Sequence, residues 1–308
     1  VSLPCSMAVP HPIPHDAVIY VAGHRGLVGS AVTRALQGRG YEVLGRTSRE
    51  LDLRDRDAVD DFFDDQQPTH VVLAAAKVGG ILANSTAPAD FLSDNLRIQV
   101  NVMDAAARTG VERLLFLGSS CIYPKYAEQP IREDSLLTGP LEPTNDAYAI
   151  AKIAGIMQVQ ALRRQHDVSF ISAMPTNLYG PGDNFDLQGS HVMPAMIRKM
   201  HEARKSGAPT VTLWGTGSPR REFLHVDDLA SASLFLLENY DDPQTINVGV
   251  GEDLSVQSLA QLVKDIVGYE GELVWDTSKP HGTPRNLLHA SRLTELGSKP
   301  TIPLHNGI

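Results

Sequence analysis

The sequence has few cysteines and no long apolar run, and each absence excludes a class of protein. Only two of its 308 residues are cysteines, Cys5 and Cys121. Two cysteines cannot build a disulfide framework or a zinc cluster. No segment approaches the roughly 18 uninterrupted apolar residues of a membrane span, so we expect no membrane partner. A chain of this length can bury a sizeable core in one large or two medium domains without disulfides or metal.

A basic excess is also lacking. The chain carries 27 lysines and arginines against 36 aspartates and glutamates, a formal net charge of −9. A general nucleic-acid binder would normally show a basic stripe, so we expect no nucleic-acid partner. The histidines show no metal-ligand spacing, and we expect no metal. Residues 1–15 contain four prolines without a basic start or an apolar core, which predicts a flexible tail rather than a signal peptide. A reducing, cytoplasmic setting fits this composition best.

From residue 16 onward, strand-like and helix-like segments alternate. Short runs rich in β-branched residues predict buried strands at residues 17–23, 42–45, 69–76, 111–119 and 168–174. Helical periodicity follows these runs at residues 26–38, 55–66, 89–110 and 146–166. Such alternation specifies a parallel sheet covered on both faces. We therefore predict an α/β fold, a Rossmann-type doubly wound parallel sheet, over residues 16–176.

After about residue 176 the rhythm changes. Residues 175–191 and 215–223 are rich in glycine, proline and polar residues and predict loops. We predict a smaller C-terminal α/β lobe over residues 177–308, with segments near 220–250 returning to the sheet. Such a lobe usually closes over a ligand at the carboxyl ends of parallel strands, so we expect it to bind the substrate.

Three glycines, Gly23, Gly26 and Gly29, stand between the first strand and the first helix. In this context one glycine makes a tight turn, one lets the backbone approach a pyrophosphate, and one lets the helix pack on the strand. The first N–H groups of the helix then favour an anion. We predict a dinucleotide site here, with Leu27 beside the glycines, rather than a merely structural turn.

The residues after the second strand indicate which dinucleotide binds. NAD sites usually carry an acid there for the ribose 2′-hydroxyl. Here Arg46 and Arg49 come before the first acid, Glu50, and Arg25 lies inside the glycine loop. Guanidinium groups suit a 2′-phosphate through bidentate, charge-assisted bonds. We therefore predict NADP(H) as the cofactor. Arg46 is the better candidate for the 2′-phosphate contact, and Arg49 could equally be a solvated surface charge.

A serine, a tyrosine and a lysine have the spacing of an acid–base set. Ser119 ends the fourth strand, and Tyr148 and Lys152 stand four positions apart on one helical face. A phenol has an ordinary pKa of about 10, and we expect the neighbouring ammonium to lower it. The bland alternative is a core tyrosine beside a surface lysine. Together with the glycine loop, this set is typical of short-chain dehydrogenase/reductases, here in the extended form that acts on nucleotide sugars.

Longer stretches narrow the resemblance to one family. AGHRGLVGSA, LFLGSSCIYP, MPTNLYGPGDNF and WGTGSPRREFLHVDDLA occur in the family's order between Val18 and Leu296. Together they resemble the GDP-L-fucose synthase family. The resemblance implies that one site inverts C3 and C5 of GDP-4-keto-6-deoxy-D-mannose and then reduces C4 with NADPH. It also implies a homodimer through the helices near 90–109 and 146–166.

The resemblance also assigns residues to the site. Cys121 takes the position of the base that removes a proton beside the ketone, and His191 takes the position of the acid. Without the resemblance, Cys121 would be interpreted as a small buried hydrophobic residue and His191 as a helix cap. The cofactor contacts it implies beyond the glycine loop and Arg46 are Leu117, Gly118, Ser119, Ser120, Tyr148, Lys152, Pro175, Asn177, Leu178 and His191. The substrate contacts it implies are Lys77, Asn177, Lys199, Trp214, Arg221 and Lys279.

Two features depart from the family pattern. Lys199 stands where the family often has arginine, and a lysine is a point charge rather than a fork, which puts the diphosphate geometry there in question. The chain ends at LHNGI, where the family continues into a last helix, so we expect a truncated C-terminus. We interpret His225 as structural and Cys5 as inert.

Two alternatives stand beside this interpretation. The nearer is a sugar-nucleotide 4-epimerase or dehydratase with tightly held NAD, which Arg46 and the Cys121–His191 pair argue against. The other is a non-catalytic dinucleotide-sensing protein, which would not need a tuned phenol.

Overall fold

A six-stranded parallel sheet forms the centre of the computed structural model, which describes residues 11–187, 189–279 and 282–308. The strand order is β10-β5-β4-β3-β1-β2, so the order reverses between β1 and β3. The strands are β1 (Ile19–Ala22), β2 (Val43–Leu44), β3 (His70–Leu73), β4 (Arg113–Leu117), β5 (Ser169–Pro175) and β10 (Ile246–Val248). The crevice at such a reversal is where doubly wound sheets bind ligands.

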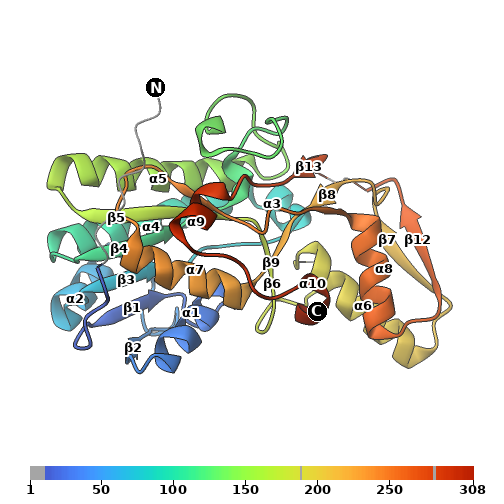
Figure 1. Ribbon diagram of the computed structural model, residues 1–308, viewed down its shortest axis with the longest axis horizontal. Helices are drawn as coiled ribbons and strands as arrows, with labels where there is room; N and C mark the ends of the chain where they lie inside the picture. Colours follow the sequence, from blue (N-terminus) through green and yellow to red (C-terminus); the bar gives the residue numbers. More distant parts are fainter. Residues whose placement is uncertain (1–10, 188, 280–281) are drawn as a thin grey trace.

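Helices cover both faces of the sheet, because side chains along each strand alternate between the faces (Figure 1). The helices are α1 (Leu27–Gly38), α2 (Arg56–Gln66), α4 (Pro88–Arg108), α5 (Asp146–His166) and α7 (Val226–Asn239). In β1, Ile19 and Val21 share a core with α1 and α7, whereas Tyr20 and Ala22 share a core with α2, α4 and α5. The predicted α/β fold with a doubly wound parallel sheet is confirmed.

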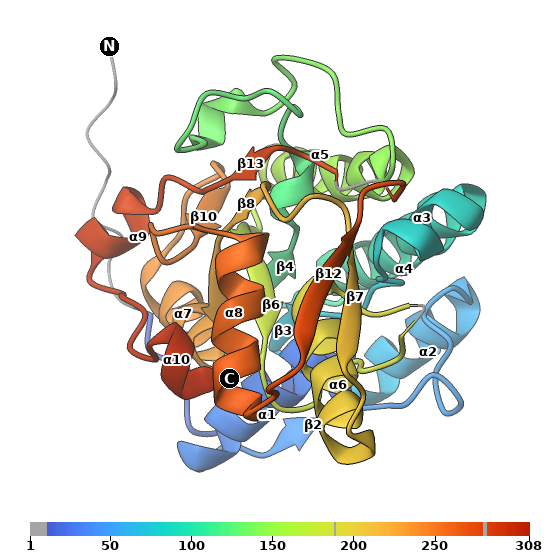
Figure 2. The ribbon, with the colours of Figure 1, turned by 90° about the vertical axis from the view of Figure 1, so that its right-hand side faces the viewer.

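A smaller lobe lies at one end of the molecule, on the right of Figure 1 and toward the viewer in Figure 2. Its main elements are α6 (Val192–Ser206), β7 (Thr210–Trp214), α8 (Val256–Val267) and β12 (Glu272–Asp276). β7 and β12 pair in parallel, and Met200 of α6 shares a core with Leu259 of α8. Ser255 begins α8 by accepting the N–H of Ser258 at 3.0 Å.

The two segments expected to be loops contain short strands. β6 (Asn177–Tyr179) pairs in parallel with β9 (Phe223–His225). β8 (Arg220–Arg221) pairs with β11 (Leu254–Ser255) and with β13 (Arg285–Asn286). The prediction of plain loops is wrong at these residues, because strands of two or three residues leave no periodic pattern and depend on distant partners.

Five short helical segments complete the described part of the chain. They are α3 (Ile81–Thr86), α9 (Ser291–Leu296), α10 (Leu304–Gly307) and the 3-10 turns η1 (Ser120–Ile122) and η2 (Glu133–Ser135). None of the helices in the described ranges is long and apolar enough to cross a membrane.

The expected tail of residues 1–15 divides into two parts. Residues 1–10, which include Cys5, lie outside the described residues. Residues 11–15 pack on the sheet domain, because the N–H of His11 donates to the carbonyl of Glu238 at 2.7 Å and the hydroxyl of Tyr41 donates to the carbonyl of Ile13 at 2.7 Å. Ile13 is buried, so this part of the segment is not a loose tail.

Candidate active site

A cavity of about 1070 Å³ extends from the carboxyl ends of the sheet strands to the lobe. Residues directly after β1, β3 and β4 line it, and so do residues of α6 and β7. All of the predicted site residues line this cavity except Arg25 and Lys279. We call the part around Ser119, Cys121, Tyr148 and Lys152 the sheet end, and the part around Lys199, Trp214 and Arg221 the lobe end.

The glycine loop permits close approach at the crevice between β1 and β3. Gly23 has a φ of 84°, and a Cβ there would lie 2.9 Å from the backbone of Ala75. A Cβ on Gly29 would lie 2.0 Å from the carbonyl oxygen of Gly23, so only glycine lets α1 pack this closely. Gly26 begins α1 without a side-chain cap, which leaves the first helical N–H groups for an anion. The loop therefore fits a dinucleotide diphosphate.

Arg46 follows β2 at the cavity wall. Its guanidinium lies 5.5 Å from the centre of the Phe62 ring. Hydrogen bonds from Thr47, with smaller effects of the Arg25 and Arg46 charges, lower the pKa of Glu50. Both arginines therefore act on the same exposed region, although Arg25 itself does not line the cavity. This positive region fits a 2′-phosphate better than the 2′-hydroxyl of NAD.

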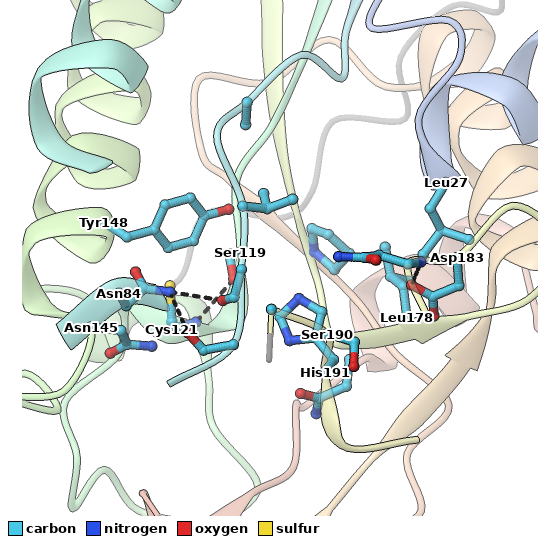
Figure 3. Close-up of a pocket in the computed structure, with 18 of the residues that line it drawn as sticks. Leu27, Asn84, Ser119, Cys121, Asn145, Tyr148, Leu178, Asp183, Ser190 and His191 are labelled. Atoms are coloured by element: carbon cyan, nitrogen blue, oxygen red, sulfur yellow. Dashed lines mark hydrogen bonds between the residues drawn. The ribbon is translucent and has the colours of Figure 1, made fainter. Parts of the chain in front are cut away.

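The predicted acid–base set comes together at the sheet end. Lys152 is buried, and its Nζ donates to the carbonyl of Leu117 at 2.8 Å, so the end of β4 fixes the ammonium. The same Nζ lies 5.8 Å from the centre of the Tyr148 ring. Ser119 begins η1 and accepts the N–H of Cys121 at 3.4 Å. Figure 3 shows Ser119, Cys121 and Tyr148 on one side of the cavity.

Burial governs the proton affinities of this set. It raises the pKa of Tyr148 and lowers the pKa of Lys152 to about 8. The prediction of a lowered Tyr148 pKa is therefore wrong for this structure, because desolvation of the phenol, with a smaller effect of Cys121, raises it. Tyr148 is a protonated phenol at neutral pH, which is the form that can donate a proton.

Cys121 and His191 lie on opposite sides of the cavity (Figure 3). Burial raises the pKa of the Cys121 thiol to about 11, with Ser119 and Lys152 acting in the opposite direction. His191, an exposed residue on the cavity wall, begins α6, and desolvation by the surrounding protein lowers the pKa of its imidazole. At neutral pH the pair therefore rests as a thiol and a neutral imidazole.

The lobe end presents a flat aromatic ring close to two lysines. Trp214 is 44% exposed, and the Nζ atoms of Lys199 and Lys279 lie 6.0 Å and 5.7 Å from the centre of its ring. Lys199 also donates to the carbonyl of Thr212 at 3.0 Å. Burial lowers the pKa of Arg221 to about 10, which still leaves its guanidinium charged at neutral pH. A stacking face beside positive charge fits a nucleoside diphosphate.

Known proteins share this architecture. Residues 19–249 match the NAD dependent epimerase/dehydratase family. The chain is 60% identical to the probable GDP-L-fucose synthase 1 of Oryza sativa subsp. japonica over 292 residues, which are 94% of this chain and 89% of that protein. It is 52% identical to the GDP-L-fucose synthase of Escherichia coli strain K12, over 94% of each chain. This chain belongs to the GDP-L-fucose synthase family.

A solved structure from the same family supports the fold. The GDP-L-fucose synthetase of Naegleria fowleri bound to NADP has a TM-score of 0.89 and is 31% identical, covering 98% of this chain and 92% of that one. Within the described ranges, no group of three or more histidine, cysteine or acidic side chains could hold a metal ion.

Two residues singled out from the sequence have partners within the fold. Lys77 lines the cavity of this GDP-L-fucose synthase family member, but its ammonium pairs with Asp94 at 3.0 Å and Asp90 at 3.2 Å. A substrate contact at Lys77 would therefore compete with two carboxylates of α4. His225 is structural as predicted, because it accepts the N–H of Asp227 at 3.2 Å and begins α7.

Sequence reasoning missed a set of buried polar atoms on the cavity wall. Each lacks a hydrogen-bond partner among the described residues, and they are Asn84 Oδ1, Asn145 Oδ1, Asp183 Oδ2, Ser190 Oγ and Asn286 Oδ1. Buried polar atoms are nearly always hydrogen-bonded in proteins, so such a set marks a place for a polar ligand. The only local signal is that Asn84 is a lone amide in the apolar stretch GGILAN.

Proposed function

We propose that this member of the GDP-L-fucose synthase family converts GDP-4-keto-6-deoxy-D-mannose into GDP-L-fucose. It inverts C3 and C5 and then reduces C4 with NADPH. The observation that carries the proposal is that Cys121 and His191 lie on opposite sides of the cavity that also contains Ser119, Tyr148 and Lys152. Inversion beside a ketone needs a base and an acid on opposite faces, and reduction needs a proton donor at the carbonyl oxygen. One cavity supplies both.

The two ends of the cavity divide the substrate between them. The ring of Trp214 and the charges of Lys199 and Arg221 suit the guanine and diphosphate of a GDP-sugar. The sugar then reaches toward the sheet end, where the acid–base set lies. This division supports a nucleotide-sugar substrate rather than a small free sugar.

NADP(H) supplies a hydride for C4 when it is bound. The close backbone contact at Gly23 and Gly29 and the uncapped first turn of α1 fit its diphosphate. Arg46 fits the 2′-phosphate. These residues bind and orient the cofactor, and the proton chemistry belongs to other side chains.

In each inversion, Cys121 acts as a thiolate and removes the proton from the carbon beside the ketone. The electron pair moves to the C4 oxygen, where the hydroxyls of Ser119 and Tyr148 donate hydrogen bonds to the enolate. His191 acts as an imidazolium and returns a proton from the opposite face, which inverts the carbon. The pair is then a thiol and a neutral imidazole, so it must exchange protons with water before the second inversion.

In the reduction, Tyr148 gives its proton to the C4 oxygen as hydride reaches C4. Burial keeps the phenol protonated until that moment. The resulting phenolate lies close to the Lys152 ammonium, whose Nζ is 5.8 Å from the ring centre. Lys152 therefore stabilises the product form of Tyr148 rather than its resting form.

A homodimer and a cytoplasmic location complete the proposal. α4 and α5 pack on each other and expose Val100, Ile150 and Met157, which are 38%, 45% and 43% exposed. A second copy would remove these apolar side chains from water. Light scattering should give twice the 33.4 kDa chain mass, and a monomer mass would contradict the dimer. Cys121 must stay a free thiol, which a reducing cytoplasm favours.

The deciding experiment incubates the protein with GDP-4-keto-6-deoxymannose and NADPH and identifies the sugar product. We expect GDP-fucose, with one NADPH oxidised per sugar. A folded protein that binds NADPH without oxidising it would support the dinucleotide-sensing alternative. Conversion of a nucleotide sugar with no net NADPH oxidation would support the 4-epimerase or dehydratase alternative.

A further inference from the structure

The loop that joins β3 to α3 contacts the segment just before His191. The N–H of Gly80 donates to the carbonyl of Gly189 at 3.1 Å. A Cβ on Gly80 would lie 2.7 Å from the carbonyl oxygen of Ser190, so the two backbones meet where no side chain fits. This contact ends one residue before His191.

The place of the His191 ring depends on its backbone. The ring caps no N–H of α6, and among the described residues none makes a hydrogen bond with the imidazole. The carbonyl of His191 accepts the N–H of Ala195 at 3.2 Å, as the first turn of α6 requires. On the preceding side, the N–H of Ser190 donates to the carbonyl of Asp186 at 3.0 Å. These backbone contacts and the contact with Gly80 therefore determine the position of the His191 ring.

Asn84 holds the same loop from α3. Its Nδ2 donates to the carbonyls of Gly79 at 2.7 Å and Gly80 at 3.1 Å, and the side chain is 6% exposed. These two carbonyls fix the orientation of the amide, because an oxygen in place of Nδ2 would face two acceptors. Asn84 Oδ1 is left without a partner among the described residues, and Asn84 lines the cavity beside the sheet end (Figure 3). Both N–H donors of the Asn84 amide are therefore used in hydrogen bonds to the loop.

We propose that Asn84 is a positioning residue for the two inversions and acts on His191 through Gly80 and Gly189. The inference rests on the proposed function. The path runs from the Asn84 amide to the Gly80 carbonyl, from the Gly80 N–H to the Gly189 carbonyl, and along the chain to His191. Tyr148 takes no part in this hydrogen-bond path, because it stands on α5 and packs its ring against Phe91. Loss of the Asn84 amide therefore disturbs inversion more than reduction.

Inversion and reduction act on the same ketone, so the ratio of inverted to uninverted product measures their relative rates. Hydride delivery after inversion gives GDP-fucose. Hydride delivery before inversion gives a 6-deoxyhexose that keeps the original configuration at C3 and C5. The fraction of inverted product is a ratio within one reaction, so it does not depend on how much folded enzyme is present.

The test compares Asn84→Ala with the matched control Ser85→Ala. Ser85 is the next residue of α3 and is exposed, and within the described part of the chain its hydroxyl donates only to the carbonyl of Leu82 in its own helix. Each variant receives GDP-4-keto-6-deoxymannose and NADPH, and the products are separated. Solvent deuterium exchange at C3 and C5 is measured separately without NADPH. For Asn84→Ala we expect exchange to fall roughly 10- to 100-fold, as for a catalytic group displaced by about 1 Å, and the inverted fraction to fall with it.

The outcomes separate the inference from the function on which it rests. If neither the unaltered protein nor Ser85→Ala makes GDP-fucose, the proposed function fails. If both make it and Asn84→Ala gives the same inverted fraction and exchange, the positioning role is overturned.

Two further variants keep the test decisive if Asn84→Ala does not fold. Asn84→Asp keeps the side-chain shape while removing both N–H donors. Gly80→Ala disturbs the next step of the path, because a Cβ there would lie 2.7 Å from the carbonyl oxygen of Ser190. Thermal melting and NADPH binding show which variants are folded. A folded Asn84→Asp or Gly80→Ala should give a reduced inverted fraction, and an unchanged fraction in either would overturn the proposal.

Discussion

The two ends of the cavity differ in how deeply they bury their lysines and in what lies beside them. At the sheet end, Lys152 is buried, a backbone carbonyl fixes its Nζ at 2.8 Å, and its pKa falls to about 8. At the lobe end, Lys199 also donates to a backbone carbonyl and burial lowers its pKa, but it is only half-buried. Lys199 and Lys279 both lie near the ring of Trp214, which is 44% exposed. The sheet end thus uses burial and fixed geometry to adjust proton affinity, whereas the lobe end uses charge and a flat surface to bind. Changes at the sheet end should alter the chemistry, and changes at the lobe end should alter substrate affinity.

Tyr148→Phe is expected to cause the largest loss. The phenol donates the proton for reduction and supports the enolate in both inversions, so its removal should lower the rate of NADPH oxidation by about 10⁴-fold, near the top of the range for general acid catalysis. NADPH affinity should change little. Stopped-flow NADPH oxidation and a fluorescence titration measure the two quantities.

Tyr126→Phe is the matched control, because Tyr126 is 76% exposed and outside the cavity lining. If Tyr148→Phe kept more than a tenth of the unaltered rate, its role as proton donor would be refuted.

Cys121→Ser should separate inversion from reduction. A serine hydroxyl is a far weaker base than a thiolate, so deuterium exchange at C3 and C5 should fall by about 10²-fold or more, while NADPH still reduces the uninverted ketone. Product analysis should show a 6-deoxyhexose in place of fucose. Cys5→Ser, the change at the other cysteine, serves as the control. GDP-fucose formation by Cys121→Ser at the unaltered rate would exclude Cys121 as the base.

The pH dependence of exchange tests the same pair without a substitution. The rate needs a thiolate and an imidazolium together. Desolvation by the surrounding protein lowers the pKa of His191 below its ordinary value of 6.5. Below that pKa the imidazole is already protonated, and the thiolate fraction falls tenfold per pH unit. Between that pKa and the Cys121 pKa of about 11, the two fractions change in opposite directions and the rate stays level. Exchange should therefore stay level from pH 6.5 to 9.5 and fall only on the acid side, below the lowered pKa of His191. A second change in the exchange rate near pH 9.0, the ordinary thiol pKa, would contradict a raised pKa for Cys121 if Cys121→Ser abolished that change.

The sheet end was also the more predictable from sequence. Its residues follow long local patterns: the helix predicted at 146–166 is α5 with those bounds, and the four-residue spacing places Tyr148 and Lys152 together. The glycine loop was predictable for the same reason, since a strand, a turn and a helix adjoin in the chain. The fold class followed from this alternation of segments.

What the sequence could not predict depends on partners far along the chain. The pKa of Tyr148 rises because of burial, which no local spacing reveals. β8 has only two residues, and its partners begin at Leu254 and Arg285. The proposed role of Asn84 follows from its contacts with the Gly79 and Gly80 carbonyls and from the segment that this loop contacts. Such sites lack a periodic signal, so they require the three-dimensional structure.

Arg46→Ala tests the cofactor side with a smaller expected effect. Loss of one charge-assisted contact to a 2′-phosphate should weaken NADPH binding about tenfold and leave NADH binding nearly unchanged. Titration of both dinucleotides measures the difference. Arg49→Ala is the control, because Arg49 is exposed and, unlike Arg46, does not line the cavity. Equal losses for NADPH and NADH would refute contact with the phosphate.

Lys199 gives the smallest expected effect and the sharpest test of the lobe end. The side chain lies 6.0 Å from the Trp214 ring centre and is partly held by the carbonyl of Thr212, so it adds one charge to a site that Arg221 also supplies. Lys199→Ala should raise KM for the GDP-sugar by about fivefold with little change in kcat, because a contact made equally in the ground and transition states affects binding alone. Lys199→Arg should lower KM below the unaltered value if a planar fork binds the diphosphate better than a point charge. Lys205→Ala, at an exposed lysine in the last turn of the same helix, should leave both constants unchanged. A fall in kcat with KM unchanged in Lys199→Ala would mean that the lobe end takes part in the chemistry, and the division between the two ends would have to be abandoned.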